Sequence, residues 1–255
     1  RHNFSKESLL NILEGFNDLN VCVIGDTIVD EYIACSPLGM SQEDPTIVVT
    51  PTDSARFLGG AGIVAKHAAS LGSNVYFLTV VGNDIVGNYV SEELEVDKLH
   101  PVIAVDENRS TTLKQRFQAE GKSLLKVSHL TQDSIDEKIQ NFLLEAFETV
   151  LPKVDLVVFS DFNYGCLPQS LVDSLIKRSK EANKLLVSDS QSSSQIGDIS
   201  RFKGMDIVFA TEREARISLK DTEDGLVILA DKLKKNSDSK NIFLKLGSEG
   251  LLLHI

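Results

Sequence analysis

The chain has 255 residues, a formal net charge of −11, 42% hydrophobic and 25% charged side chains. This length and composition are typical of one large globular domain. They exclude collagen-like, disordered and membrane-spanning classes, because the apolar runs are far shorter than the ~20 residues that cross a bilayer. The acidic balance also argues against nucleic acid or an anionic membrane surface as a partner.

The first 15 residues form an amphipathic helical pattern, without the apolar core and cleavage site of a signal peptide. The three cysteines, Cys22, Cys35 and Cys166, are far apart and lack C-x-x-C spacing. They therefore predict neither a disulfide framework nor a zinc site. Free thiols fit a reducing compartment, so we expect a cytoplasmic protein.

Short apolar runs then alternate with segments of helical period along most of the chain. Strands are predicted at residues 21–24, 75–81, 156–159, 185–188, 206–209 and 241–245. Helices are predicted at residues 60–71, 84–94, 134–150, 168–182, 212–219 and 224–233. This alternation predicts an α/β fold with a mostly parallel sheet covered by helices on both faces.

Two stretches, residues 28–57 and 101–127, break the alternation. They have polar and apolar residues in strand-like alternation, and the second contains a hairpin with its turn at residues 119–122. We expect both to add antiparallel strands to the parallel core. A small accessory sheet at one end of an α/β domain would be suited to act as a lid.

Acidic and glycine-rich motifs follow several of the predicted strands. The first is Gly-Asp-Thr at residues 25–27 with Asp30 close behind, and the second is the glycine run of residues 59–62. A carboxylate there can accept hydrogen bonds from a polyol, and glycines at a helix start let a ligand approach bare backbone. Each motif alone is as well explained by loop structure. Their convergence on the carboxyl edge of one sheet indicates a ligand site.

In their order, these motifs resemble those of the ribokinase-like (phosphofructokinase B type) carbohydrate kinases over nearly the whole chain. Residues 25–32, 41–48 and 110–116 most resemble the D-glycero-β-D-manno-heptose-7-phosphate kinase branch. The resemblance implies a single three-layer α/β/α domain over residues 1–255, with a mostly parallel central sheet and a small β-sheet lid. It also implies phosphorylation of a hydroxyl on a sugar or sugar phosphate, with ATP and Mg²⁺ as cofactors.

The resemblance also assigns residues to the site. The sugar would be held by Asp30, Gly59, Gly60 and Asp161, and Lys114 and Arg116 on the hairpin could meet a phosphosugar anion. The nucleotide would be held by Asp189, Thr211, Glu214, Lys245, Gly247 and Gly250, with Glu214 also near the metal. By analogy, an exposed lid strand makes a homodimer through the lid an option.

The sequence departs from the family pattern at several positions. Ile63 and Thr211 stand where Asn is usual, and Tyr164 stands where Lys is common. No Gly-Ala-Gly-Asp loop, which carries the family's catalytic base, occurs in these residues. We therefore assign no catalytic base, and expect that the domain lacks its C-terminal part and is inactive alone. The alternative is a non-catalytic ligand-binding or scaffolding module of a larger protein.

Overall fold

The apolar runs form one eight-stranded sheet in the computed structural model, which describes residues 5–191 and 197–255. The strand order is β12-β11-β10-β9-β8-β1-β4-β5, and only the pair of β11 and β12 is antiparallel. The strands are β1 (Asn20–Gly25), β4 (Asn74–Gly82), β5 (Leu99–Asp106), β8 (Leu156–Asp161), β9 (Leu185–Ser190), β10 (Ile207–Thr211), β11 (Asn241–Lys245) and β12 (Leu251–His254). The predicted parallel α/β sheet is confirmed.

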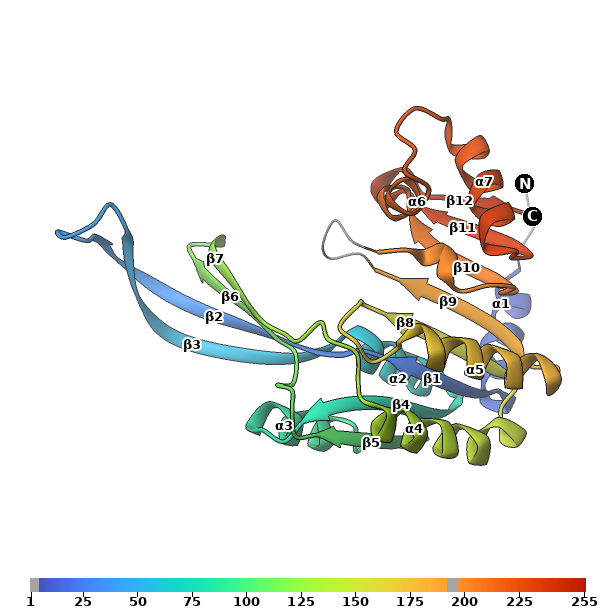
Figure 1. Ribbon diagram of the computed structural model, residues 1–255. Coiled ribbons are helices and arrows are strands. Elements are labelled where there is room, and N and C mark those ends of the chain that lie inside the picture. The colour runs from blue at the N-terminus through green and yellow to red at the C-terminus, as the bar shows by residue number, and fades with distance from the viewer. Residues whose placement is uncertain (1–4, 192–196) are drawn as a thin grey trace.

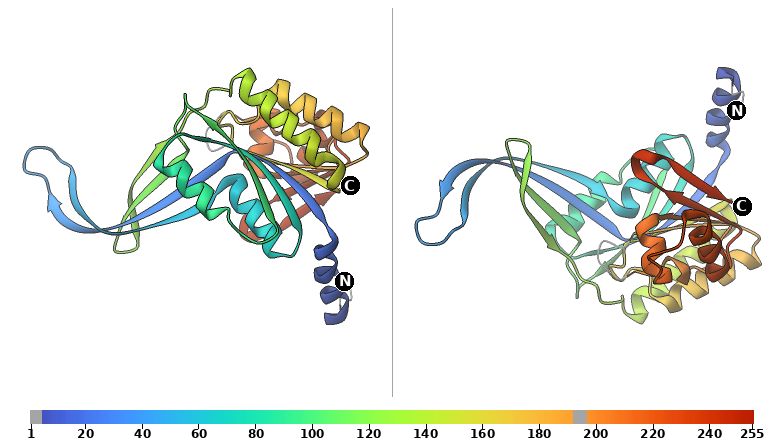
Figure 2. Two further views of the ribbon diagram at one scale, coloured as in Figure 1. Left: turned by 90° about the horizontal axis from the view of Figure 1, so that it is seen from below. Right: turned by 90° about the horizontal axis from the view of Figure 1, so that it is seen from above.

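Helices cover this sheet on both faces (Figures 1 and 2). One face carries α4 (Glu137–Val150), α5 (Gln169–Glu181), α6 (Glu212–Leu219) and α7 (Leu226–Ser237). The other carries α2 (Gly60–Ser70) and α3 (Ile85–Glu93). Single 3₁₀ turns are η1 (Phe16–Asp18), η2 (Leu151–Lys153), η3 (Ile199–Arg201) and η4 (Gly247–Glu249). The chain therefore has the expected three-layer α/β/α architecture.

The second face is covered over only part of its width. Val23 of β1 and Phe77 of β4 are fully buried beneath α2 and α3. By register, the same face continues through Phe209 of β10 to Leu253 of β12. There Leu253 is 49% exposed and Leu185 of β9 is 57% exposed. The half of the sheet from β9 to β12 thus presents apolar side chains to solvent on this face.

A separate four-stranded sheet projects from the body (Figure 1). It has the order β3-β2-β6-β7, with β2 (Thr27–Met40), β3 (Ile47–Gly59), β6 (Leu113–Ala119) and β7 (Lys122–His129). We call it the lid sheet. The predicted hairpin is confirmed as β6 and β7, which are joined by a two-residue turn in which Glu120 and Gly121 both have positive φ.

Two details of the lid sheet differ from the expectation. The start of the segment 101–127 lies in β5, which pairs in parallel with β4 at the edge of the main sheet. In addition, β2 and β6 pair in parallel, whereas only antiparallel additions were expected. The reason is topological. Strand β2 follows the carboxyl end of β1 and β6 follows that of β5, so both strands leave the same edge of the body in the same direction.

The predicted N-terminal helix is present as α1 (Lys6–Gly15), but none of its residues is buried. Leu9 and Leu13 are each about half exposed. Figure 2 shows this blue helix projecting from the body on the side that carries α2. None of the described helices has both the length and the apolar character that a membrane span requires.

Candidate functional site

Acidic and glycine residues meet at the joint where the lid sheet leaves the body. Only Asp26 separates β1 from β2, and β3 runs directly into α2. A Cβ on Gly60, whose φ is +60°, would lie 2.4 Å from the Asp26 carbonyl oxygen. A Cβ on Gly59 would lie 2.6 Å from Oδ2 of Asp30. Gly60 therefore needs to be glycine, because it lies directly against backbone and has a left-handed conformation, whereas at Gly59 the absence of a side chain leaves room for the Asp30 carboxylate.

Basic side chains of β6 face the same joint. In the parallel register, Lys114 lies beside Asp30, and Arg116 lies beside Tyr32. Nη1 of Arg116 is 2.8 Å from Oδ1 of Asp30, and its guanidinium lies 4.9 Å from the centre of the Tyr32 ring. The structure thus places Lys114 and Arg116 beside Asp30, whose carboxylate lies against Gly59. That these residues hold a sugar stays a prediction.

Asp161 lies apart from this group, in a buried network beneath the surface. It is 1% exposed, and its Oδ2 is 2.8 Å from Nη2 of Arg201 and accepts a hydrogen bond from the Ser190 hydroxyl at 2.9 Å. Arg201 also donates to the carbonyl of Leu167. These contacts tie the ends of β8 and β9 to η3. The carboxylate of Asp161 is therefore engaged within the protein, and we leave it out of the sugar site.

A second buried carboxylate, that of Asp26, organises the loop that follows β8. Its Oδ2 accepts the backbone N–H groups of Phe162 (2.7 Å) and Tyr164 (3.3 Å), and its Oδ1 accepts that of Cys166 (3.1 Å). Burial and the nearby charge of Asp161 raise the pKa of Asp26 to about 6, although these hydrogen bonds oppose the shift. The Gly-Asp-Thr motif marked this residue as a carboxylate at a strand end, but not its distant partners.

The candidate nucleotide residues lie at the carboxyl ends of β9, β10 and β11. Lys245 of β11 reaches across β10, and its Nζ is 2.7 Å from Oδ1 of Asp189 on β9. The side chains of Thr211 and Glu214 form a capping box at the start of α6. The Glu214 amide donates to the Thr211 hydroxyl (3.2 Å), and the Thr211 amide donates to Oε2 of Glu214 (2.7 Å).

This capping box bears on the predicted metal role of Glu214. One carboxylate oxygen is used by the helix start, and Oε1 has no hydrogen bond within residues 5–191 and 197–255. No group of three or more His, Cys, Asp or Glu side chains in that part of the chain could hold a metal ion by itself. A single carboxylate beside substrate phosphates is nevertheless a common arrangement for Mg²⁺, so the donor set fits a metal that arrives with a nucleotide.

An open cleft of about 820 Å³ adjoins these residues. It is lined by Thr211, Glu212, Arg213, Arg216, Ile217, Lys220, Thr222, Lys245, Leu246 and Gly247. The only carboxylate among these lining residues is that of Glu212, which pairs with Arg216 at 2.7 Å. The other basic side chains of the lining are Arg213, Lys220 and Lys245. The cleft is thus positive within an acidic protein, and part of its wall is apolar. Such a surface favours a polyanion that also carries an apolar ring.

The predicted glycines Gly247 and Gly250 form the turn between β11 and β12. Their φ angles are +61° and +104°, and a Cβ at either position would meet no atom within 4 Å. The backbone conformation therefore requires glycine there, whereas crowding does not. Gly247 lines the cleft, and Gly250 closes the turn by donating to the carbonyl of Gly247.

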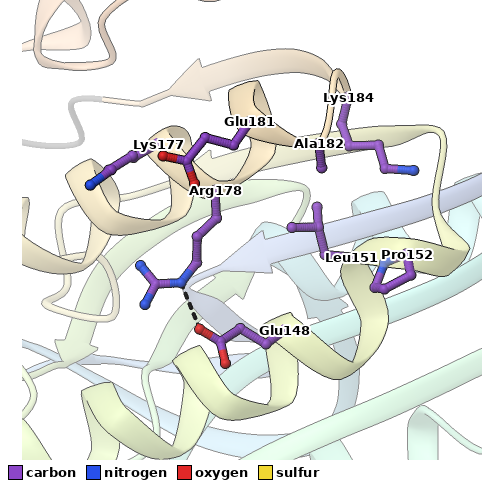
Figure 3. Close-up of a pocket in the computed structure, with 8 residues that line it drawn as sticks. All are labelled: Glu148, Leu151, Pro152, Lys177, Arg178, Glu181, Ala182 and Lys184. Atoms are coloured by element: carbon purple, nitrogen blue, oxygen red, sulfur yellow. Dashed lines mark hydrogen bonds and ion pairs between the residues drawn. The ribbon is translucent and has the colours of Figure 1, made fainter.

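Another hollow, of about 770 Å³, lies at the opposite, amino-terminal edge of the sheet (Figure 3). It is formed by the ends of α4 and α5 together with η2, and Arg178 pairs there with Glu148 at 2.7 Å. It contains none of the predicted site residues. The site is therefore placed at the carboxyl edge, where the predicted residues gather.

The sequence matches known proteins over most of its length. The profile of the pfkB family of carbohydrate kinases matches residues 18–254. The bifunctional protein HldE of Paramagnetospirillum magneticum is 28% identical over 250 residues, which are 96% of this chain and 50% of that protein. HldE of Helicobacter hepaticus is 30% identical over 91% of this chain and 48% of its own length. The chain spans about half the length of these relatives.

Solved structures share the fold. The phosphofructokinase-2 of Escherichia coli in complex with fructose-6-phosphate has a TM-score of 0.71 at 14% identity, covering 92% of this chain and 76% of its own. The ribokinase of Arabidopsis thaliana complexed with ribose and ATP has a TM-score of 0.66 at 18% identity, covering 93% of this chain and 75% of its own. At such identities the likeness is one of architecture.

Proposed function

This chain belongs to the pfkB family of carbohydrate kinases, and we propose that it binds a sugar or sugar phosphate at the lid joint and ATP with Mg²⁺ in the basic cleft. The reaction served by these sites is transfer of the γ-phosphoryl group to a sugar hydroxyl. Heptose 7-phosphate is the first candidate substrate, because the motifs resemble those of the heptose-7-phosphate kinase branch. The chain's similarity to two HldE proteins is consistent with this choice.

The observation that carries this proposal is the placement of Asp30. Its carboxylate lies against the bare backbone of Gly59 and is oriented by Arg116 at 2.8 Å. Two carboxylate oxygens can accept hydrogen bonds from neighbouring sugar hydroxyls. Arg116 holds the side chain in place and keeps its charge compensated, so that Asp30 is ready to orient a polyol.

On the nucleotide side, Lys245 supplies positive charge for phosphate oxygens. Its ion pair with Asp189 holds the ammonium over the end of β10, next to the start of α6. Glu214 would offer its second carboxylate oxygen to Mg²⁺. When bound, the metal neutralises charge on the transferring phosphate, which with in-line positioning is the main requirement of phosphoryl transfer.

No residue is assigned as the catalytic base, since the Gly-Ala-Gly-Asp loop of the family is not present in the sequence. We therefore expect these 255 residues to bind ligands without measurable turnover. A non-catalytic binding module is the second candidate. The observation that favours it is the set of departures from the family pattern, in which Ile63 and Thr211 stand where Asn is usual and Tyr164 stands where Lys is common.

The test is calorimetric titration of heptose 7-phosphate into the full chain and into Asp30→Ala. We expect at least a tenfold weaker affinity in the variant, since it loses charge-assisted hydrogen bonds to the ligand. Asp53→Ala is the matched control, because Asp53 is an exposed carboxylate of β3. It lies opposite Ala34, which is four positions beyond Asp30 along β2. Equal affinity in all three proteins would contradict the assigned sugar site. Sugar-dependent ADP release by these residues in the presence of ATP and Mg²⁺ would contradict both the expected lack of turnover and the non-catalytic alternative.

A further inference from the structure

The side chain of Lys114 bridges the lid sheet and the body. Its Nζ lies 5.1 Å from the centre of the Tyr164 ring and 6.0 Å from that of the Phe162 ring. The two rings are 6.5 Å apart and nearly parallel, with 25° between their planes. Both separations are within the range of cation–π attraction. The ammonium group of a lid strand is thus seated on two rings of the body.

The rings are held by the buried carboxylate at the joint. Oδ2 of Asp26 accepts the backbone N–H groups of both Phe162 and Tyr164. Between them, Asn163 has a φ of +59°, and this left-handed conformation lets the residues on either side bond to the same oxygen. Tyr164 is only 3% exposed. The rings of Phe162 and Tyr164 are therefore a fixed part of the body.

The two cations of β6 differ in how they are compensated. Arg116 pairs with Asp30 at 2.8 Å. Lys114 has no carboxylate within 4 Å in residues 5–191 and 197–255, and the remaining residues of the chain contain no Asp or Glu. A carboxylate partner would cancel the charge of Lys114 and compete with an incoming anion. Aromatic rings fix the position of an ammonium while leaving its charge available.

We propose that Phe162 and Tyr164 position the Lys114 ammonium to receive the phosphate of a phosphorylated sugar. The inference rests on the proposed function, in which heptose 7-phosphate is the first candidate substrate, and adds the residues that position the cation for its phosphate. Lys114 is the residue that touches the ligand, and the two aromatic residues are positioning residues. The body and the lid sheet then each supply part of one phosphate subsite.

The experiment compares heptose 7-phosphate with the unphosphorylated heptose by calorimetry on the full chain. The ratio of the two affinities measures the contribution of the phosphate. We expect a ratio of at least about ten for the wild type and close to one for Lys114→Met. Phe162→Leu and Tyr164→Leu should each lower the ratio about threefold or more, whereas Tyr164→Phe, which keeps the ring, should preserve it. Affinity for the free heptose is measured for every variant, so that the ratio reports the contribution of the phosphate alone.

Lys122→Met is the matched control, because Lys122 is an exposed lysine of the same sheet at the far end of β7. Phe162→Leu provides the test should the buried Tyr164→Leu variant fail to fold. An unchanged ratio in Lys114→Met, or in Phe162→Leu, would overturn the inference. A wild-type ratio of one with intact heptose binding would overturn it while leaving the sugar site in place. A wild type that binds neither heptose would instead contradict the proposed function.

Discussion

Asp26 connects three parts of the molecule through a single side chain. Its backbone joins β1 to β2, its carbonyl accepts the amide of Ala61 in α2, and its carboxylate holds the loop after β8. An amide side chain could not accept three N–H groups as well, because it has only one acceptor oxygen. This arrangement also buries the carboxylate of Asp26 beside that of Asp161, which disfavours its ionised form.

The raised pKa of Asp26 predicts that the stability of the folded protein depends on pH. The pKa of Asp26 is about 6 in the folded protein against an ordinary 3.8, so the folded state retains a proton that the unfolded state has lost. The stabilisation is fully present below about pH 4 and is lost as pH rises through about 6. The free energy of unfolding of the wild type, relative to Asp26→Asn, should therefore fall by on the order of 2–3 kcal/mol between pH 4 and pH 7. Urea titrations at several pH values measure this difference. A difference that is constant or grows with pH would contradict the raised pKa.

At the residue scale, the sequence predicts what lies close to a motif and misses what the fold brings from far away. Asp30, Gly59 and Gly60 follow directly from glycine and carboxylate positions at strand ends. The pairing of Asp161 with Arg201 does not, since 40 positions and a strand separate them. A sequence pattern alone cannot distinguish an acidic side chain that faces a ligand from one that is buried in an ion pair.

At the scale of elements, the periodicity of buried residues predicts the helices and central strands, because each must bury a continuous face. Strand β5 lies at the edge of the main sheet, so its exposed and buried residues mix as they do in a lid strand. The sequence pattern therefore does not distinguish β5 from the strands of the lid sheet. The parallel pairing of β2 and β6 also cannot be read from a pattern, since paired residues such as Asp30 and Lys114 are far apart in the chain.

The capping box of α6 gives a prediction at this scale. Thr211→Ala removes the side-chain acceptor of the Glu214 amide, and should lower the free energy of unfolding by about 1 kcal/mol. Thr211→Asn should lose much less, because Asn also caps helices well. Thermal and urea unfolding of both variants measure the effect. If Asn proved as destabilising as Ala, the role of Thr211 would not be that of a helix cap.

At the scale of the whole molecule, one sheet carries two apolar cores. One lies beneath α4 to α7 and the other beneath α2 and α3, and both include side chains of β1 and β8. The lid sheet has only a small separate cluster, in which Ile33, Cys35 and Ala119 are buried. The body should therefore unfold cooperatively, while the outer lid opens at a much lower free energy.

Hydrogen exchange tests this difference. Backbone amides in the outer part of the lid sheet, which is the end of β2 after Cys35 and the start of β3 that pairs with it, should exchange at least about a hundredfold faster than those of β1 and β8. The reason is that the outer ends of β2 and β3 are exposed on both faces. Mass spectrometry of peptic fragments resolves the two regions. Similar protection in both would contradict a lid that opens independently, and added heptose 7-phosphate should slow exchange mainly near the joint.

Only Asp26 separates β1 from β2, so a rotation of the lid sheet relative to the body at this residue is enlarged with distance along β2. Strand β2 has 14 residues, so at about 3.3 Å per residue its far end lies up to roughly 45 Å from the joint. A rotation of about 5° at Asp26 then moves the far end of β2 by about 4 Å. A fluorophore on the exposed turn at residues 41–46 would therefore report small rearrangements around a ligand as a large displacement, far from the atoms that bind it.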